Sequence, residues 1–282
     1  MIGILGSGFG LYGYLPALCL YYPNKKILLN SASRLKFNAR TELREYSSQI
    51  IWVDGIEQII NRSELLIICY PPFEVEKLID ILIKSPVLKK IIVEKPVCET
   101  PEKSRNFIEK IELAGKKIIS SYIFIYTDWF KNISINLSTK HKIDWQLLNV
   151  NPKESWKWNE QQGGGLLNFY GIHLVAICAY FDFKCVEITH NSFEKLECVF
   201  RNNFNEFIFT INYTKDETFF KVDDNYIGPT PFGVQSKLEK KDFRIEFLLC
   251  LIDNFEKNYL ELNQLLKKTI SLWNQIECQL KY

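Results

Sequence analysis

The sequence lacks several features that would define broad classes of protein. Its 35 Lys and Arg residues almost balance 33 Asp and Glu residues, so neither nucleic acid nor an anionic membrane surface is indicated as a partner. No run approaches the roughly 20 apolar residues that a membrane-spanning helix needs. No basic segment with a cleavage site follows Met1. We therefore expect a cytoplasmic protein.

Patterns typical of disulfide frameworks and metal sites are absent too. Eight cysteines are scattered along the chain, and no two form a C-x-x-C pair. There are only three histidines, and none neighbours a cysteine cluster. Several cysteines lie in apolar runs, for example Cys69 and Cys250, which is typical of small buried side chains in a reducing compartment. We expect neither disulfides nor a bound metal.

The first half of the chain alternates short apolar runs with segments of helical character. Continuous apolar strands separated by helices predict a parallel sheet that is covered on both faces. A doubly wound Rossmann domain is therefore expected over residues 1–121. The expected strands are 1–5, 26–29, 50–53, 65–69, 91–93 and 117–120, and the expected helices are 34–46, a segment from an N-cap at Asp54, 73–84, and a segment that opens at Thr100-Pro101.

The second half has a different pattern. Alternating runs at 185–191, 196–201 and 206–213 predict a largely antiparallel open sheet. One helix is expected before them, over 166–181, and two after them, over 242–259 and 260–279. The length suits two domains, so residues 122–282 are predicted to form a second, α+β domain for substrate binding and oligomerisation.

A glycine loop follows the first apolar run. Gly6 permits a tight turn, and Gly8 lets the backbone approach a pyrophosphate. A helix is expected after Phe9 and Gly10, and its N-terminus would face the phosphates. A strict G-x-G-x-x-G motif would place its third glycine where this chain has Leu11. A glycine-rich turn without a ligand is therefore the alternative.

Two later segments hold candidate catalytic residues. Glu94-Lys95-Pro96 follows the 91–93 strand, and ligands of doubly wound sheets bind just beyond the carboxyl ends of strands. Lys95 could polarise a carbonyl or exchange a proton there; the alternative is a surface lysine paired with Glu94. In the second segment, glycines 163–165 precede a helix that places His173 on a face with Tyr170; the alternative is a structural histidine.

Together these motifs resemble the Gfo/Idh/MocA oxidoreductases, named for glucose–fructose oxidoreductase and inositol dehydrogenase. The resemblance covers essentially the whole chain. It implies a nicotinamide cofactor, places Lys95 and His173 where substrate meets the nicotinamide, and implies a homodimer or homotetramer joined through the second sheet. The matching residues are the 6–10 loop with Leu15-Pro16-Ala17, the Glu94-Lys95-Pro96 signature, and Gly163, Gly164, Gly165, Leu167, Gly171 and His173 of a G-G-G-x-L-x-D-x-G-x-H segment.

One position departs from that family pattern. The family aspartate falls on Phe169, which can neither hydrogen-bond a sugar hydroxyl nor carry a proton. Asn168 is adjacent but points about 100° away on a regular helix. Tyr170 lies on the correct side, and its phenol could donate a hydrogen bond. The resemblance therefore implies Lys95 and His173 as catalytic residues, with Tyr170 as a further hydrogen-bond donor to the substrate.

Cofactor choice is indicated by the residues after the second strand. NAD-preferring folds place an acid there for the ribose hydroxyls, whereas this chain has none from Asn30 until Glu42. Ser33 and Arg34 could instead hold a 2′-phosphate, and a Ser-Arg pair at this point of the family implies NADP. NAD and a merely solvated arginine are the alternatives. By the same resemblance, Tyr70-Pro71-Pro72 lies beside the nicotinamide ribose.

We therefore expect an NADP(H)-preferring oxidoreductase. It would transfer hydride between nicotinamide and a hydroxyl or carbonyl carbon of a sugar, nucleotide-sugar or polyol. His173 is the first candidate to exchange the proton, with Lys95 orienting the oxygen. Trp129, Trp156 and Trp158 could stack on a sugar ring or pack in the core. Two alternatives stay open: a catalytically degenerate sensor or regulator, which Phe169 favours, and a reductase of an imine or a tetrapyrrole.

Overall fold

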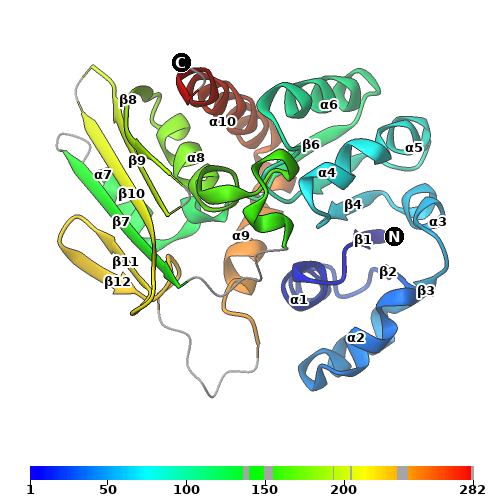
Figure 1. Ribbon diagram of the computed structural model, residues 1–282. Helices are drawn as coiled ribbons and strands as arrows, with labels where there is room; N and C mark the ends of the chain where they lie inside the picture. The colour runs from blue at the N-terminus through cyan, green and yellow to red at the C-terminus, as the bar shows by residue number, and fades with distance from the viewer. Residues whose placement is uncertain (136–139, 149–154, 193, 204, 234–240, 281–282) are drawn as a thin grey trace. The chain divides into compact units, whose positions relative to one another are not determined.

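A computed structural model describes the chain apart from residues 136–139, 149–154, 193, 204, 234–240 and 281–282 (Figure 1). The described residues form two compact units. Unit 1 comprises Met1–Cys98, Lys103–Ser121 and the described residues of 236–263. Unit 2 comprises Glu99–Glu102, the described residues of 122–235, and those from Gln264 onward.

Unit 1 is built on a six-stranded parallel sheet, as the continuous apolar runs predict. Its strand order is β3-β2-β1-β4-β5-β6. The order reverses between β1 and β4, so the chain segments that leave these two strands flank the point where doubly wound sheets bind ligands. The strands are β1 Ile2–Leu5, β2 Ile27–Asn30, β3 Ile50–Val53, β4 Leu65–Ile68, β5 Lys90–Val93 and β6 Lys117–Ser120.

The helices of unit 1 are shorter and more irregular than their sequence patterns predict. The expected helix over 34–46 is a short α-helix followed by a 3-10 helix over Thr41–Gln49. Its polar sequence buries little, since Leu35 is 83% exposed. Gly55, at φ 94°, is the N-cap that was expected at Asp54. The α-helices are α1 Leu15–Tyr21, α2 Arg34–Asn38, α3 Ile56–Arg62, α4 Pro72–Val75, α5 Ile79–Lys84, α6 Pro101–Leu113 and α9 Ile245–Lys257.

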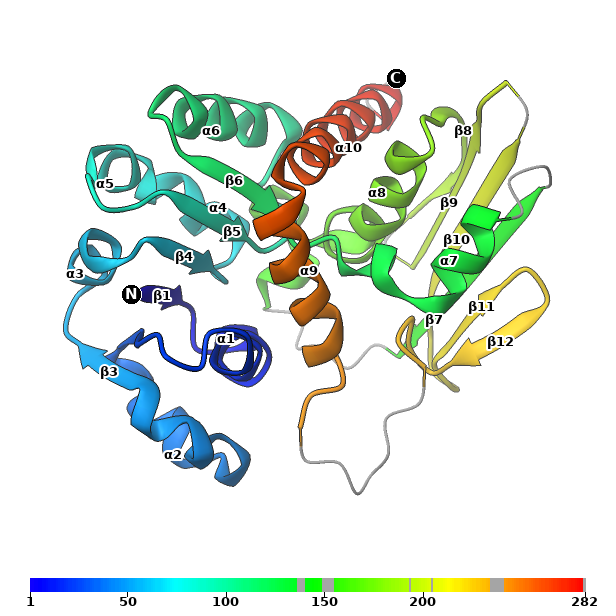
Figure 2. The ribbon, with the colours of Figure 1, turned by 180° about the vertical axis from the view of Figure 1, so that it is seen from behind.

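Helix α9 returns to unit 1 from far along the sequence, so the expected second domain over 122–282 does not form one unit. Figures 1 and 2 show α1 and α9 side by side. The buried face of α9 includes Leu248, Leu251 and Phe255. The Tyr21 hydroxyl also donates a 3.0 Å hydrogen bond to Asp253. Burial of this amphipathic face explains why the segment packs with unit 1.

Unit 2 is built on a mixed, mostly antiparallel sheet in the order β12-β11-β7-β10-β9-β8, in which β7 and β10 run parallel. Helix α8, Ile172–Tyr180, lies against one face (Figure 1). The others are α7, Asp128–Ile135, and most of α10, Tyr259–Leu280, which belongs to unit 2 from Gln264 onward. The strands are β7 His141–Leu148, β8 Lys184–Asn191, β9 Lys195–Arg201, β10 Glu206–Thr214, β11 Phe219–Val222 and β12 Asn225–Gly228.

Strands β7, β11 and β12 are not among the predicted elements. Along β7, Ile143, Trp145 and Leu147 are buried while the intervening Lys142 and Asp144 form an ion pair of 2.9 Å. This alternation gives the sheet one apolar face and one polar face.

All eight cysteines are free thiols. Cys250 is exposed, contrary to its expected burial, because it lies off the buried face of α9. Within the described ranges no group of three or more His, Cys, Asp or Glu side chains is placed to hold a metal ion. None of the helices described here is both long and apolar enough to cross a membrane.

Candidate functional site

The glycine loop follows β1 at the switch point of the unit 1 sheet. Its glycines are needed there for different reasons. Gly6 has φ 117°, and a Cβ there would lie 2.6 Å from the carbonyl oxygen of Cys69. A Cβ at Gly10 would lie 2.8 Å from a methyl group of Ile4. Gly8 is exposed, and a Cβ there would meet no described atom within 4 Å. Packing therefore requires Gly6 and Gly10, whereas Gly8 leaves bare backbone facing open space.

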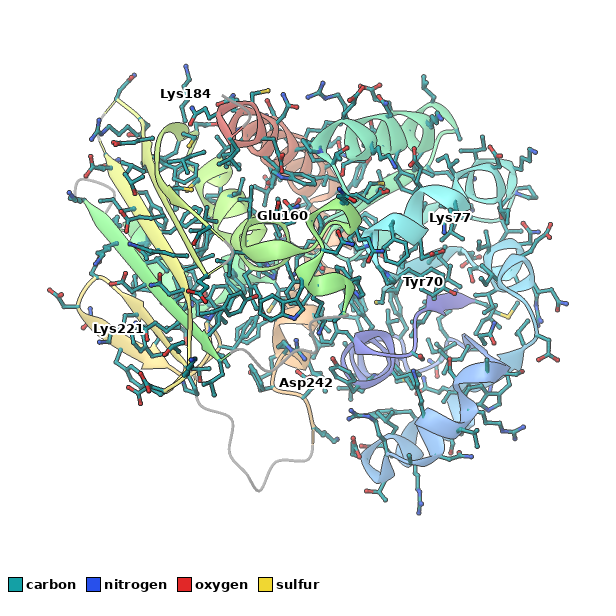
Figure 3. All side chains as sticks on the ribbon, viewed as in Figure 1. Tyr70, Lys77, Glu160, Lys184, Lys221 and Asp242 are labelled. Carbon is teal, nitrogen blue, oxygen red and sulfur yellow. The ribbon has the colours of Figure 1, made fainter. Side chains whose placement is uncertain are left out.

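The helix after the loop begins with a π-helical turn over Gly10–Tyr14 and continues as α1. The Phe9 ring packs over Gly13, where a Cβ would collide with it. The Arg244 guanidinium lies 4.2 Å from the centroid of the same ring. Asp242, which precedes α9 (Figure 3), fixes that guanidinium through hydrogen bonds of 2.9 and 2.7 Å. The side chain of Phe9 is therefore structural, and only its backbone belongs to the candidate site.

A lysine that the sequence reasoning missed lies against the loop. Lys36 Nζ donates a 2.9 Å hydrogen bond to the Ser7 hydroxyl. The predicted Arg34 is exposed and lies 5.8 Å from the ring centroid of Trp52 instead. Ser33 ends a 3-10 turn over Ser31–Ser33 that the Asn30 side chain caps. The sequence signal that could have identified Lys36 is its position next to the buried Phe37, which places it on the exposed, polar side of α2.

Glu94 of the Glu94-Lys95-Pro96 segment is held by two hydroxyl groups within unit 1. Tyr14 donates a 3.0 Å hydrogen bond to Glu94 Oε1, and Ser121 donates one of 2.6 Å to the same atom. Burial, followed by the nearby Glu94 charge, raises the pKa of Tyr14 well above its usual value, so Tyr14 remains a donor. Glu94 therefore joins the end of β5 to the π-helical turn before α1 and to the residue that follows β6. Lys95 is half-buried, and its peptide bond to Pro96 is cis.

This network gives a testable stability effect. Replacing Tyr14 with phenylalanine removes one donor from a half-buried carboxylate, which is expected to cost about 1–3 kcal/mol of unfolding free energy. Tyr226→Phe, at a 58% exposed position, is the matched control and is expected to change it by less than about 0.5 kcal/mol. Urea unfolding of the three proteins measures both values. Equal stability of all three would contradict the assigned hydrogen bond.

Tyr70, which is labelled in Figure 3, follows β4 at the other side of the switch point, and Pro71 and Pro72 come next in the sequence. Tyr70 is half-buried, and burial followed by the charge of Glu74 raises the pKa of its phenol. Pro71 precedes α4, and its carbonyl accepts a 2.9 Å hydrogen bond from the Glu74 N–H group. These residues lie just beyond the carboxyl end of β4, and the preceding Cys69 is held beside the glycine loop because its N–H group donates to the Leu5 carbonyl at 2.7 Å.

In unit 2 the glycine triplet is explained by packing. A Cβ at Gly164 would collide with the carbonyl oxygen of Trp156. Gly165 has φ 85°, and a Cβ there would lie 2.8 Å from the Glu160 side chain (Figure 3). Gly163, at φ 82°, ends the 3-10 turn over Glu160–Gln162. The triplet therefore lets the chain pass close to another backbone segment.

The segment after the triplet is a π-helix over Leu166–Gly171, not the regular helix that was expected. Asn168 therefore does not lie on a regular helix, where it would point about 100° away from Phe169. Asn168 is only 5% exposed, and its Oδ1 has no hydrogen-bond partner in the described structure. The Phe169 ring is half-buried, with Trp156 edge-on at 5.5 Å and Lys157 Nζ 5.0 Å from its centroid.

His173 is held in an aromatic cluster of unit 2. His173 is 7% exposed. Its ring stacks on Phe124, with 4.0 Å between the ring centroids and 5° between the ring planes. Phe124 contacts Trp145 at 5.8 Å, and Trp145 meets Tyr170 edge-on at 5.4 Å. The structure thus places His173 and Tyr170 in one cluster, as expected. Burial, followed by the neighbouring Tyr170, raises the pKa of Tyr213.

The tryptophans considered for sugar stacking are mostly packed. Trp158 is 8% exposed and lies 4.5 Å from the Tyr213 ring. Trp129 is 5% exposed, and its indole N–H donates to the Pro231 carbonyl at 2.7 Å. Trp156 is half-buried against Phe169.

Comparison with solved structures identifies the fold. The chain superimposes on the WlbA (WbpB) dehydrogenase of Thermus thermophilus, solved with NAD and UDP-GlcNAcA, with a TM-score of 0.68, 13% identity, and 98% and 94% of the two chains covered. KijD10, a 3-ketoreductase of Actinomadura kijaniata solved with NADP, gives a TM-score of 0.71 and 11% identity, with 98% and 96% covered. The chain has the fold of the Gfo/Idh/MocA-type oxidoreductases. The expected fold class is therefore confirmed.

The same fold includes a regulator. Gal80p of Kluyveromyces lactis, a transcriptional regulator, matches with a TM-score of 0.70 and 9% identity, over 98% of this chain and 87% of that one. No family model and no curated protein matches the sequence. At these identities the structural likeness establishes the fold alone.

Proposed function

We propose that the protein is an NADP(H)-preferring oxidoreductase that acts on a hydroxyl or carbonyl carbon of a sugar, nucleotide-sugar or polyol. The observation that carries this proposal is the glycine loop at the switch point. Gly8 presents bare backbone to open space there, and Lys36 brings a cation to the neighbouring Ser7. Both features suit a phosphorylated dinucleotide.

The residues of unit 1 fit such a cofactor. The backbone of residues 6–10 would hold the pyrophosphate, and Ser33, Arg34 and Lys36 would hold a 2′-phosphate. Tyr70, Pro71 and Pro72 would lie beside the nicotinamide ribose, as the family resemblance implies. When bound, the nicotinamide supplies the hydride donor or acceptor.

The chain's own residues would manage the proton and the substrate oxygen. In oxidation, His173 would take the hydroxyl proton, and a bound nicotinamide would be the acceptor for the hydride of the carbinol carbon. In reduction, His173 would return that proton to the oxygen. Stacking on Phe124 fixes the plane of the imidazole. Lys95 would orient and polarise the oxygen. Glu94, the residue before it, is held by the hydroxyl groups of Tyr14 and Ser121.

The position of Lys36 predicts how cofactor preference changes on mutation. A charge-assisted contact with a phosphate is worth about 1.5–3 kcal/mol, so Lys36→Gln is expected to weaken NADPH binding by about 10–100-fold. NADH lacks the 2′-phosphate and is expected to lose less than about threefold. Fluorescence titration of the purified protein with each nucleotide measures both constants.

Lys77→Gln is the matched control for this experiment, because Lys77 is exposed and paired with Glu74 at 2.7 Å. It is expected to leave both affinities unchanged. If Lys36→Gln lowers the affinity for NADPH and for NADH equally, Lys36 binds the pyrophosphate and not the 2′-phosphate. No loss for either would remove it from the cofactor site.

A catalytically inactive regulator is the second candidate, and Phe169 favours it. An aromatic ring, packed against Trp156 and Lys157, occupies the position at which the family resemblance calls for an aspartate. The test is a hydride-transfer screen of the purified protein with both cofactors and with nucleotide-sugars, polyols and keto-sugars. Measurable NADPH binding without turnover of any of them would favour the regulator.

A further inference from the structure

Unit 2 holds a cavity of about 200 Å³ that contains none of the residues assigned above to catalysis or cofactor binding. It lies between α7, the first residue of β7 and the hairpin of β11 and β12, which Figure 2 shows around one end of the sheet. Two aliphatic side chains of the hairpin and Ile133 complete its apolar wall. Its other lining residues are Trp129, Asn132, His141, Asp223 and Asn225.

The carboxylate in this cavity is rigidly held. Asp223 lies in the turn between β11 and β12 with φ 55°, a left-handed conformation that Asp tolerates better than most residues. Its N–H group donates to the Lys142 carbonyl at 2.7 Å, and its Oδ1 accepts from the Lys142 N–H group at 2.8 Å. Its Oδ2 lies 3.1 Å from Nδ1 of His141, a residue that is 5% exposed. These contacts fix the direction of both carboxylate oxygens.

The remaining lining groups mainly offer hydrogen bonds. The carboxamides of Asn132 and Asn225 have no hydrogen-bond partner among the described residues, so their donors and acceptors can serve a ligand. The Trp129 N–H group already bonds to the Pro231 carbonyl, and the ring packs against Phe220 and is 5% exposed, so only a small part of this indole borders the cavity. Among the described residues that line the cavity there is neither Lys nor Arg.

We propose that this cavity is a binding site for a neutral monosaccharide. Carboxylate and carboxamide groups pair with neighbouring hydroxyls, and the apolar wall of Ile133, Val222 and Ile227 contacts the C–H groups of a sugar ring. The absence of a lining cation, in the part of the wall that the structure describes, disfavours phosphorylated or acidic sugars. The site stands independently of the proposed nicotinamide function, because it uses residues of unit 2 that have no part in that proposal.

The test is calorimetric titration of the full chain, without nucleotide, with D-glucose and D-mannose, and with glucose 6-phosphate as the anionic comparison. Saturable binding of at least one neutral sugar is expected, with a Kd near or below about 1 mM, and weaker binding of the phosphate ester. Asn225→Ala and Asn132→Ala, both at exposed positions, are expected to weaken it at least about tenfold with an unchanged Tm. Asn38→Ala, on the exposed end of α2, is the matched control and is expected to retain full affinity.

Two results would overturn the proposal. One is no saturable binding of either neutral sugar; the other is binding that neither Asn225→Ala nor Asn132→Ala weakens, which would place the sugar elsewhere. NADPH affinity is measured on the same preparations. Loss of NADPH binding with sugar binding intact would count against the proposed function and leave this site standing.

Discussion

Replacing Gly8 with valine is expected to weaken NADPH binding at least about 100-fold, a loss of about 2.8 kcal/mol, while leaving Tm unchanged. A Cβ at Gly8 meets no described atom within 4 Å, so the folded protein accommodates the side chain. The same side chain would stand where a pyrophosphate must approach the backbone. Fluorescence titration and thermal unfolding of the variant measure the two effects separately.

Gly6→Val is the matched control, and it is expected to behave in the opposite sense. The left-handed conformation at φ 117° costs a branched residue at least about 1–2 kcal/mol. The added Cβ would also press on the Cys69 carbonyl oxygen at 2.6 Å. Gly6→Val should therefore unfold at a lower temperature than the unmodified protein. NADPH binding by Gly8→Val with unchanged affinity would contradict the assignment of this loop to the cofactor.

Replacing His173 with asparagine is expected to lower kcat by about 10²–10⁴-fold on the substrate that the hydride-transfer screen identifies. Asparagine retains a polar side chain but cannot exchange a proton near neutral pH. Because His173 is not among the residues proposed to hold the nucleotide, the affinity for NADPH should remain unchanged. Steady-state kinetics with a matched NADPH titration separate the two quantities.

Tyr170→Phe is the control within the same aromatic cluster. It keeps the edge-on ring contact with Trp145, 5.4 Å between centroids, and removes only the hydroxyl. A much smaller loss of kcat is expected than for His173→Asn. Turnover by His173→Asn within about twofold of the unmodified protein would make this histidine structural, with its role limited to stacking on Phe124.

The parallel sheet of unit 1 was predictable because its strands are buried on both faces. Leu65–Ile68 and Ile91–Val93, for example, are continuous apolar runs whose residues are all buried. Strand β7 is not among the predicted elements although Ile143, Trp145 and Leu147 alternate with polar residues, the same pattern that predicted β8, β9 and β10. The return of α9 to unit 1 depends on packing against α1, which no local pattern encodes.

The candidate site was predictable in part, for a related reason. Glycines, the Glu94-Lys95-Pro96 segment and His173 stand at recognisable spacings, so the sequence identifies them. The contact between Lys36 and Ser7 joins residues 29 positions apart and arises from the positions of α2 and the loop. The π-helix over Leu166–Gly171 depends on backbone hydrogen bonding that its composition does not reveal.

The most direct test of the proposed function is equilibrium titration of the unmodified protein with NADPH and NADH, followed by protein fluorescence. The bare backbone at Gly8 and the cation at Lys36 predict saturable binding of NADPH, at least about tenfold tighter than binding of NADH. Binding of neither nucleotide at millimolar concentration would contradict the proposal that this protein uses a nicotinamide cofactor.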